Sequence, residues 1–453
     1  MSKRTHSPFR IVAIASLLLG TLPLSIVQAA PSAALAAAPV AVPLAVGPTV
    51  TVTAQLRDTL LIDVDGDSKA DPGDTLHYTA TIANSGSSNA TGVGFNLTLD
   101  SNTALSGGVS ASPVAVNDTY AVNGNVSISV PAESGLQSND YLGAPTAALT
   151  APISSTQGGN LTVNSDGSFA YNPPPGYEGV DTFIYTLTNA TGVNTGIVTL
   201  NISGMIWFVD NNAPSCTTLA AGCGRLDKPF SSLAAFQAIN NGSGNNPATN
   251  DSLFIYSRAS NYTGGVTLLN NQKVIGQGAG ATLVSIAGIT LAPYGVSLPN
   301  TGGKRPTLTH SANNVTLATS NTVRGLDIDN TGGTALLGSS VGNLTLNELS
   351  VTNTNASCVA AVSLSNGNPD ATFTRVNATG CTNGIYLNTT TGSVRVIGDG
   401  ASAQNGSGGT ISGSTADGIR AISVSNLQLA RMNIQNSGAS GIFGTALNGF
   451  TSD

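Results

Sequence analysis

The chain has 453 residues, which is enough for roughly two to four domains. Charged residues make up 9% and aromatic residues 5%, while glycine is abundant at 53 residues, and this composition favours short strands and turns over helices. The formal net charge is −7, so the surface repels nucleic acid and we expect no nucleic-acid partner.

The first 29 residues have the pattern of a signal peptide. Basic residues precede an apolar run over 11–27, and the small residues Val27 and Ala29 mark a cleavage site. A membrane anchor is the competing interpretation, but a glycine and a proline interrupt the apolar run. No later stretch of sequence is long and apolar enough to span a bilayer. We therefore expect a secreted protein, or one on the outer surface of a bacterium, with no transmembrane segment after cleavage.

Residues 30–48 form an Ala/Pro linker, because frequent proline disfavours both helix and sheet. From residue 49 polar and apolar side chains alternate, as they do in strands. The stretch "PGDTLHYTATIANSG" followed by "ATGV" resembles a bacterial surface-repeat family with an immunoglobulin-like sandwich. The resemblance covers residues 49–112 and implies a β-sandwich.

The stretch "DVDGDSKADPGD" concentrates carboxylates in a chain that has few charges. Calcium binds about six to eight oxygen atoms. The positions that fit a twelve-residue calcium loop are Asp63, Asp65, Asp67, Lys69 through its carbonyl, Asp71 and Asp74. The loop resembles that of an EF-hand, although Ser68 replaces its glycine and the final position is aspartate. We predict a structural Ca²⁺ site here, and the alternative is a solvated acidic hairpin tip.

Residues 113–204 have a second strand-and-turn pattern. Asp166-Gly167 predicts a hairpin turn, and Phe183, Tyr185 and Leu187 alternate onto one face. The run from "PVAVNDTY" to "DTFIYTLTNATG" resembles the cadherin-like tandem-repeat domain of bacterial adhesins. The resemblance implies a second β-sandwich.

Residues 205–453 begin with "MIWFVDNNAP", after which a helical segment and then repeated short strands follow. Ser231 or Ser232 is placed to cap this helix, and Leu233 and Phe236 share its apolar face. A short amphipathic helix suits the start of a solenoid, whose first coil otherwise exposes an apolar end. The opening "WFVDN" and "GRLDKPFSSLAAF" resembles the pectin-lyase-like right-handed parallel β-helix. The chain stops directly after a strand-like coil, so we expect the β-helix to be incomplete at its C-terminal end.

The four cysteines of an exported protein are expected to form disulfides, and no CxxC pair favours a zinc site. Cys358 and Cys381 lie 23 residues apart, and each is followed at the same spacing by a leucine. This is about one turn of a β-helix, and stacked coils lie about 4.8 Å apart. We therefore predict a Cys358–Cys381 bridge, with Cys216 and Cys223 closing a local loop beside the helix.

A candidate catalytic set lies on one predicted strand. Asp327 and Asp329 point to the same side, roughly 7 Å apart, and Arg324 precedes them. This separation does not distinguish retaining from inverting hydrolysis. The alternative is that both are solvated surface carboxylates, and the Gly-His-Gly element of glycosidase-like β-helix enzymes is missing from the sequence. We therefore assign no catalytic residue unless the protein proves to be an enzyme.

The expected fold class is all-β, with two Ig-like and cadherin-like sandwiches followed by a parallel β-helix that has a short N-terminal capping helix. We expect an adhesin-like structural protein that displays Asn, Ser and Thr side chains to a polysaccharide or to extracellular matrix. The alternative is an extracellular polysaccharide lyase or glycoside hydrolase. A weaker third option is a phage-like or biofilm-matrix binding protein.

Overall fold

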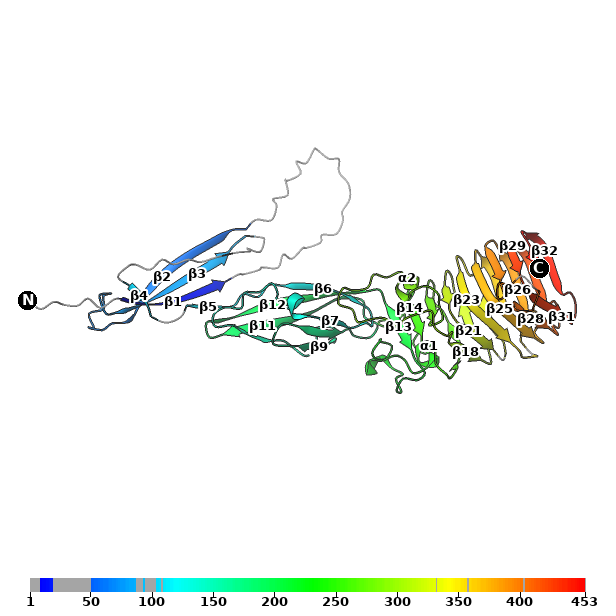
Figure 1. Cartoon of the computed structure of the whole chain (residues 1–453), viewed down its shortest axis with the longest axis horizontal. Coiled ribbons are helices and arrows are strands. Elements are labelled where there is room, and N and C mark those ends of the chain that lie inside the picture. Colours follow the sequence, from blue (N-terminus) through cyan, green and yellow to red (C-terminus); the bar gives the residue numbers. More distant parts are fainter. Residues whose placement is uncertain are drawn as a thin grey trace, which may run out of the picture.

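The computed structural model describes residues 9–18, 50–86, 93, 103–106, 109–330, 332–356, 358–401 and 404–452. Figure 1 shows three parts along the long axis: an N-terminal sheet, a middle domain, and a coil region of stacked strands that ends at the C-terminus. Among the described residues, no helix has the length and apolar character needed to cross a membrane.

The N-terminal sheet has the order β2-β3-β1-β4, with β5 also paired to β1. Its strands are β1 (Phe9–Leu18), β2 (Val52–Ile62), β3 (Thr75–Asn84), β4 (Thr103–Leu105) and β5 (Ser110–Ala111). Strands β2 and β3 are antiparallel, and Ala80 and Ile82 of β3 are buried. Strand β1 lies inside the predicted signal peptide. Its cleavage and the two-layer Ig-like sandwich stay predictions, and much of 87–108 lies outside the described residues.

The middle domain packs two sheets face to face. One sheet has the order β7-β10-β9 and the other β6-β12-β11-β8. Its elements are β6 (Asp118–Asn123), β7 (Ile128–Val130), η1 (Ala132–Ser134), β8 (Ala148–Thr150), β9 (Asn160–Val163), β10 (Phe169–Asn172), β11 (Gly179–Asn189) and β12 (Gly192–Ser203). Phe183, Tyr185 and Leu187 are buried in its core, as predicted. Gly167, with φ of 83°, forms the predicted turn between the antiparallel strands β9 and β10.

The coil region consists of three parallel ladders of strands, an arrangement consistent with a parallel β-helix. The first ladder contains β13 (Ile206–Val209), β14 (Ser252–Ile255), β17 (Lys273–Gly276), β20 (Thr322–Arg324), β23 (Thr345–Asn353), β25 (Asp370–Thr379), β27 (Ser393–Val396), β30 (Leu427–Leu429) and β33 (Thr451–Ser452). The second contains β15 (Tyr262–Thr263), β18 (Thr307–His310), β21 (Asp327–Asn330), the distal halves of β23 and β25, β28 (Gly409–Ser412) and β31 (Met432–Gln435). The third contains β16 (Val266–Thr267), β19 (Val315–Leu317), β22 (Thr334–Gly338), β24 (Ala360–Gly367), β26 (Ile385–Thr390), β29 (Ile419–Ser425) and β32 (Ile442–Asn448).

Inside the coils, equivalent apolar side chains stack in register. Leu308, Ile328, Val351 and Val376 pair from strand to strand in the second ladder, and none is more than 1% exposed. Leu364 of β24 pairs with Leu387 of β26, which are the leucines of the predicted 23-residue repeat. The core is therefore one continuous column of mostly aliphatic side chains, and its burial is the main stabilising term of the coil region.

The predicted helix is α1 (Leu233–Gln237), and the Oγ of Ser232 accepts a hydrogen bond from the backbone N–H of Ala235 at 3.1 Å. Leu233 and Phe236 are buried against the first coils, as expected for the apolar face. Two further short helices, which the sequence analysis did not predict, are η2 (Leu219–Ala221) and α2 (Leu283–Ala287).

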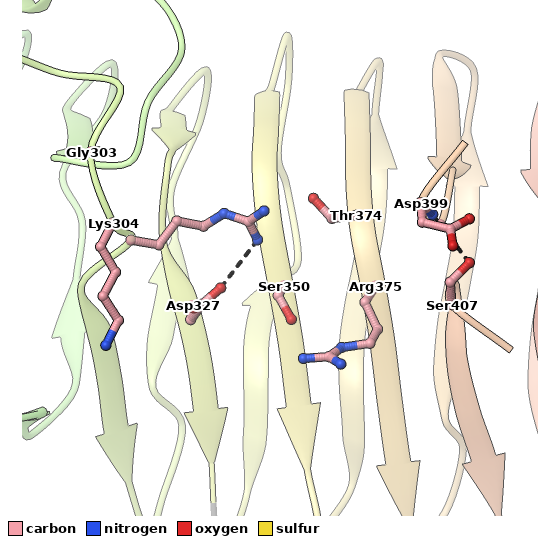
Figure 2. A pocket seen from close by; sticks show the side chains of 10 residues that line it. Gly303, Lys304, Asp327, Ser350, Thr374, Arg375, Asp399 and Ser407 are labelled. Atoms are coloured by element: carbon pink, nitrogen blue, oxygen red, sulfur yellow. Dashed lines mark hydrogen bonds and ion pairs between the residues drawn. The ribbon is translucent and has the colours of Figure 1, made fainter. Parts of the chain in front are cut away.

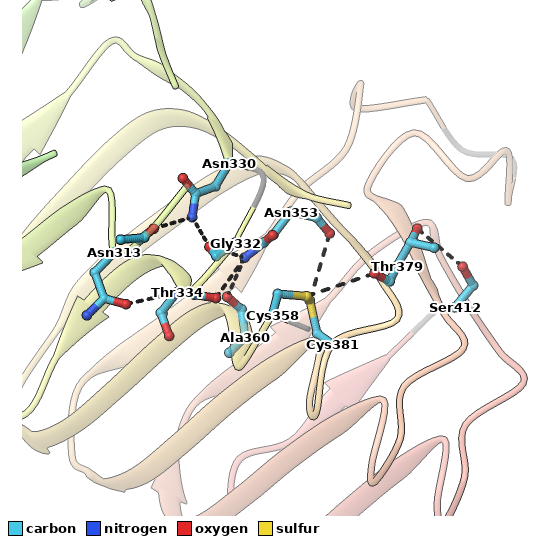
Figure 3. Close-up of a disulfide and its surroundings, with 12 residues drawn as sticks. Asn313, Asn330, Gly332, Thr334, Asn353, Cys358, Ala360, Thr379, Cys381 and Ser412 are labelled. Atoms are coloured by element: carbon cyan, nitrogen blue, oxygen red, sulfur yellow. Dashed lines mark hydrogen bonds between the residues drawn. A yellow bond between two sulfur atoms is a disulfide. The ribbon is translucent and has the colours of Figure 1, made fainter. Parts of the chain in front are cut away.

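Both predicted disulfides are present. The Cα atoms of Cys216 and Cys223 are 5.5 Å apart, and those of Cys358 and Cys381 are 4.4 Å apart. Figure 3 shows the second bridge beside Asn353, at the turn that leads from the second ladder to the third. The Nδ2 of Asn353 donates to the carbonyl oxygens of Gly333 and Ala360, and Asn330 binds backbone in the preceding coil. These two asparagines are buried in the turns, so they do not belong to the displayed polar ladder that we expected.

The middle domain and the coil region share an apolar cluster and backbone hydrogen bonds, in addition to the chain that connects them. Val126 of the middle domain is fully buried with Phe208 of β13 and with Leu283 of α2. The segment after α2 then runs back along the middle domain, where Ser129 donates its backbone N–H to the carbonyl of Tyr294 at 2.9 Å. The two parts, expected as modules in series, therefore pack against each other in one continuous unit.

Candidate functional site

The acidic loop between β2 and β3 gathers three carboxylates. Asp63, Asp65 and Asp67 each bring one carboxylate oxygen within 4.8 Å of the others, and Asp65 and Asp67 are exposed. Their alternating spacing, together with Gly66 at φ of 79°, lets a short turn point all three toward one place. Hard oxygen donors in this arrangement suit a cation such as Ca²⁺.

Backbone groups orient the first carboxylate of this triad. Asp63 accepts hydrogen bonds from the backbone N–H groups of Gly66 at 2.7 Å and Ser68 at 2.8 Å. These two bonds, from Ser68 and then Gly66, lower the pKa of Asp63 below its usual range. The carboxylate therefore stays charged at neutral pH, as a metal ligand must.

Only three of the six predicted metal ligands belong to the carboxylate triad. Asp74 is buried, and its two oxygens accept the backbone N–H groups of Val64 at 2.9 Å and Asp71 at 3.0 Å, so it stabilises the loop from inside. Lys69 lies 3.8 Å from Asp67 in an exposed ion pair, and burial and nearby carboxylates raise the pKa of Asp71. Lys69, Asp71 and Asp74 are not part of the triad, and the ligand roles predicted for them stay untested.

A groove of about 440 Å³ lies on the coil region, on the outer side of neighbouring strands (Figure 2). The residues that line it are Gly303, Lys304, Arg305, Asp327, Ser350, Thr374, Arg375, Gly398, Asp399 and Ser407. They come from five successive coils, so the groove runs along the axis of the stack.

Strand register builds the floor of this groove. Asp327 of β21 pairs with Ser350 of β23, and Ser350 pairs with Arg375 of β25. Equivalent positions on neighbouring strands lie about 4.8 Å apart, so these three side chains form one polar row across the coils. Thr374 and the loop residue Ser407 add hydroxyl groups beside the row.

Each acid in the groove already has a cation. Nη1 of Arg305 lies 3.1 Å from Oδ1 of Asp327, and Nε of Arg431 lies 3.9 Å from Oδ1 of Asp399. A backbone hydrogen bond from Ala401, followed by contacts from the loop 405–407, lowers the pKa of Asp399, so it is ionised at neutral pH. Both carboxylates are therefore held in place by a neighbouring cation.

The structure does not assemble the candidate catalytic set. Asp327 lines the groove, whereas Asp329, further along β21, is exposed outside the groove lining. Arg324 turns to Glu348 instead, with its Nε 2.8 Å from Oε2 and its Nη2 2.5 Å from Oε1. The groove cations Lys304, Arg305 and Arg375 were not predicted from the sequence. Lys304 and Arg305 are adjacent in a chain with only 9% charged residues, and this pair was a signal that could have indicated a binding site.

The middle domain holds a second acidic pair. Asp118 is 8% exposed, and its Oδ1 accepts a hydrogen bond from Asn139 at 3.1 Å. Burial, with the charge of Asp140, raises the pKa of Asp118 to about 7. Burial also raises the pKa of Asp140 to about 6, although hydrogen bonds from the backbone of Val116 and from the hydroxyl of Tyr185 act against the shift.

Comparison with known proteins identifies one part of the chain. Residues 110–204, which form the middle domain, match the family of bacterial cadherin-like domains. The chain has no match among curated proteins and none among solved structures. The middle domain is therefore a bacterial cadherin-like domain, and it suggests a surface or adhesion-type protein.

Proposed function

We propose that this chain is a secreted or cell-surface adhesin-type protein of a bacterium, and that it binds an extracellular glycan or matrix polymer in the groove of its coil region. The cadherin-like domain supports a role in surface adhesion. The two disulfides support an oxidising, extracellular location, because cytosolic thiols are kept reduced.

The observation that carries this proposal is the polar row of Asp327, Ser350 and Arg375 along the groove. A sugar chain presents hydroxyl groups at regular intervals, and a row of donors and acceptors on stacked strands presents partners at regular intervals too. The Cys358–Cys381 bridge ties the turns that follow β23 and β25, the strands that carry Ser350 and Arg375. A site held this firmly loses little conformational entropy when a ligand binds.

The test compares binding with cleavage. The purified chain is mixed with pectin, alginate, dextran and other polysaccharides, and polymer retention, chain length and new reducing ends are followed together. Retention of a polymer without shortening supports a passive binding protein. Shortening of any polymer contradicts that role, and the absence of both retention and shortening across matrix and glycan panels contradicts the assignment of the groove.

A polysaccharide lyase or hydrolase is the second candidate, and the presence of Asp327 in the groove favours it. Nη1 of Arg305 lies 3.1 Å from Oδ1 of Asp327, so the carboxylate is held in place at the floor of the groove, within reach of a bound polymer. An Asp327→Asn variant separates the two candidates, because cleavage requires the carboxylate whereas binding through neighbouring groups loses only part of its strength.

We also propose that the Asp63, Asp65 and Asp67 triad holds a structural Ca²⁺ ion. Three carboxylates within 4.8 Å repel each other, and a divalent cation relieves that repulsion. The triad lies at the end of a hairpin and far along the sequence from the groove, so the ion would stiffen the N-terminal sheet and take no part in ligand binding.

A further inference from the structure

Most of the cations of this acidic protein already have an ion-pair or hydrogen-bond partner within the protein. Residues 50–452 contain 13 lysines and arginines, the total of 16 less the three in the first ten residues. Ten of them make an ion pair or donate a hydrogen bond to a backbone carbonyl. Among the described residues, only Arg57, Lys304 and Arg375 make neither. Two of these three side chains line the groove.

Part of the positive charge in the groove therefore has no carboxylate partner among the described residues of the protein. Arg305 neutralises Asp327, and Arg431, from outside the lining, approaches Asp399. Lys304 and Arg375 remain as free cations, and both are exposed in the groove, where Figure 2 draws no ion pair or hydrogen bond to either. In a chain of net charge −7, two free cations in one groove favour an anionic occupant.

The two cations are spaced along the stack. Lys304 lies just before β18, and Arg375 lies on β25, which is three strands away through β21 and β23. Three strand spacings amount to roughly 14 Å. One small anion cannot bridge such a distance, whereas a polymer with repeated acidic groups can contact both cations at once. Between them, the hydroxyl of Ser350 and the Asp327 carboxylate face the same groove and suit sugar hydroxyl groups.

We propose that the groove selects acidic glycans, and that Lys304 and Arg375 each bind a carboxylate or sulfate group on separate units of one polymer chain. This inference rests on the proposed glycan-binding function and adds the class of ligand. The guanidinium of Arg375 offers a planar fork to an oxyanion, and the ammonium of Lys304 acts as a point charge. Binding through two exposed cations is sensitive to salt, because mobile ions screen them.

The experiment measures binding of the full chain to polygalacturonate, dextran sulfate and uncharged dextran by isothermal titration at low and at physiological salt. The test variant is Lys304→Gln with Arg375→Gln. The control variant is Arg57→Gln with Lys228→Gln, which removes the same charge from exposed positions outside the groove. Thermal unfolding of both variants checks that neither substitution disturbs folding.

We expect both acidic polymers, or one of them, to bind, dextran to bind at least tenfold more weakly, and affinity to fall as salt rises. The test variant should lose at least tenfold in affinity, and the control variant less than twofold. A preference for polygalacturonate over dextran sulfate identifies carboxylate as the recognised group, and the reverse identifies sulfate.

Two results overturn the inference. If dextran binds as tightly as the acidic polymers, or if the test variant binds as the parent does, the groove does not select charge, although the glycan-binding function survives. If no polymer binds at either salt concentration, both the inference and the function on which it rests fail.

Discussion

The side chain of Asn123, at the end of β6, donates through Nδ2 to the carbonyl oxygen of Thr290 at 2.9 Å, across 167 positions of sequence. Its Oδ1 accepts the backbone N–H of Ala292 at 2.8 Å. One buried amide thus satisfies two backbone groups of the segment that follows α2, and it joins the cadherin-like domain to the coil region. The coil region that forms the groove is therefore packed against the cadherin-like domain.

Replacing Asn123 by alanine should weaken this junction. The change leaves the Thr290 carbonyl and the Ala292 N–H without their partner, and unsatisfied buried groups of this kind cost about 2 kcal/mol. We expect a lower free energy of unfolding in urea and faster proteolysis between the two parts. The control is Asn201→Ala, because Asn201 is exposed on β12. Equal stability of the two variants would show that the junction contributes nothing.

Gly176 tests the same junction by steric contact. Its φ is 72°, and a Cβ at this position would lie only 1.9 Å from the carbonyl oxygen of Asn245 in the coil region. Gly176→Ala should therefore destabilise the protein by about 2 kcal/mol or more, measured by urea unfolding. Gly158→Ala is the matched control, since its φ is 88° and its Cβ would meet open space. If both variants lose the same stability, backbone strain explains the effect and the contact does not.

The acidic pair of the cadherin-like domain predicts that stability depends on pH. The pKa of Asp118 is raised to about 7 and that of Asp140 to about 6, both above the ordinary value of 3.8. The folded state therefore binds more protons than the unfolded state between about pH 4 and pH 7, so stability falls as pH rises through that window. We expect a higher unfolding midpoint at pH 5 than at pH 7.5.

Asp118→Asn should flatten this pH dependence, because the amide does not titrate. Burial also raises the pKa of Asp140 and of Asp251 to about 6, and both contribute in the same direction, so some slope remains in the variant. Asp58→Asn, at an exposed position of β2, is the control and should keep the full slope. The prediction is wrong if Asp118→Asn retains the slope of the parent.

The Cys358–Cys381 bridge should stabilise the coil region. It closes a loop of 23 residues, and loop-closure entropy predicts a contribution of about 3 kcal/mol. Replacing both buried cysteines by alanine should lower the free energy of unfolding by about that amount. The double alanine variant of Cys216 and Cys223, whose loop spans seven residues, should lose less. Stability equal to that of the parent after removal of Cys358 and Cys381 would contradict the prediction.

Calcium should raise the unfolding temperature of the N-terminal sheet. A ligand at 100 times its dissociation constant stabilises the folded state by about 2.7 kcal/mol, and a chelator should reverse the effect. Asp63→Asn with Asp65→Asn should abolish the response, because it removes two of the three gathered carboxylates. Asp58→Asn serves as the control. A calcium response that survives in the double variant would place the ion elsewhere.

Local signals in the sequence predicted several features that the structure confirms. Alternation placed Phe183 and Tyr185 in a core, Ser232 capped α1 as expected, and the 23-residue spacing of Cys358 and Cys381 located both a coil repeat and a bridge. Each of these depends on neighbours in sequence or on one fixed repeat, so the residue pattern carries the information. Helix α2 was not predicted, although Thr282 caps it as Ser232 caps α1.

The residues of the candidate sites were harder to predict from the sequence than the secondary-structure elements. The spacing of Asp63, Asp65 and Asp67 was enough to expect a cluster, since a single turn holds all three. Arg324, the arginine of the conditional catalytic set, pairs with Glu348 on the next coil, whereas Arg305, 22 residues before Asp327, pairs with that carboxylate. Ion pairs of this kind depend on which coils stack next to each other, and no local pattern records that.

The sequence by itself determined the class of this protein, an all-β chain with a cadherin-like domain, stacked parallel strands and two disulfides, because alternation, turns and repeat length are local properties. Only the tertiary structure decided that Lys304, Ser350 and Arg375 share one groove, and that Asn123 joins two domains. The physical reason is register: strands that stack about 4.8 Å apart bring together side chains that lie far apart along the chain.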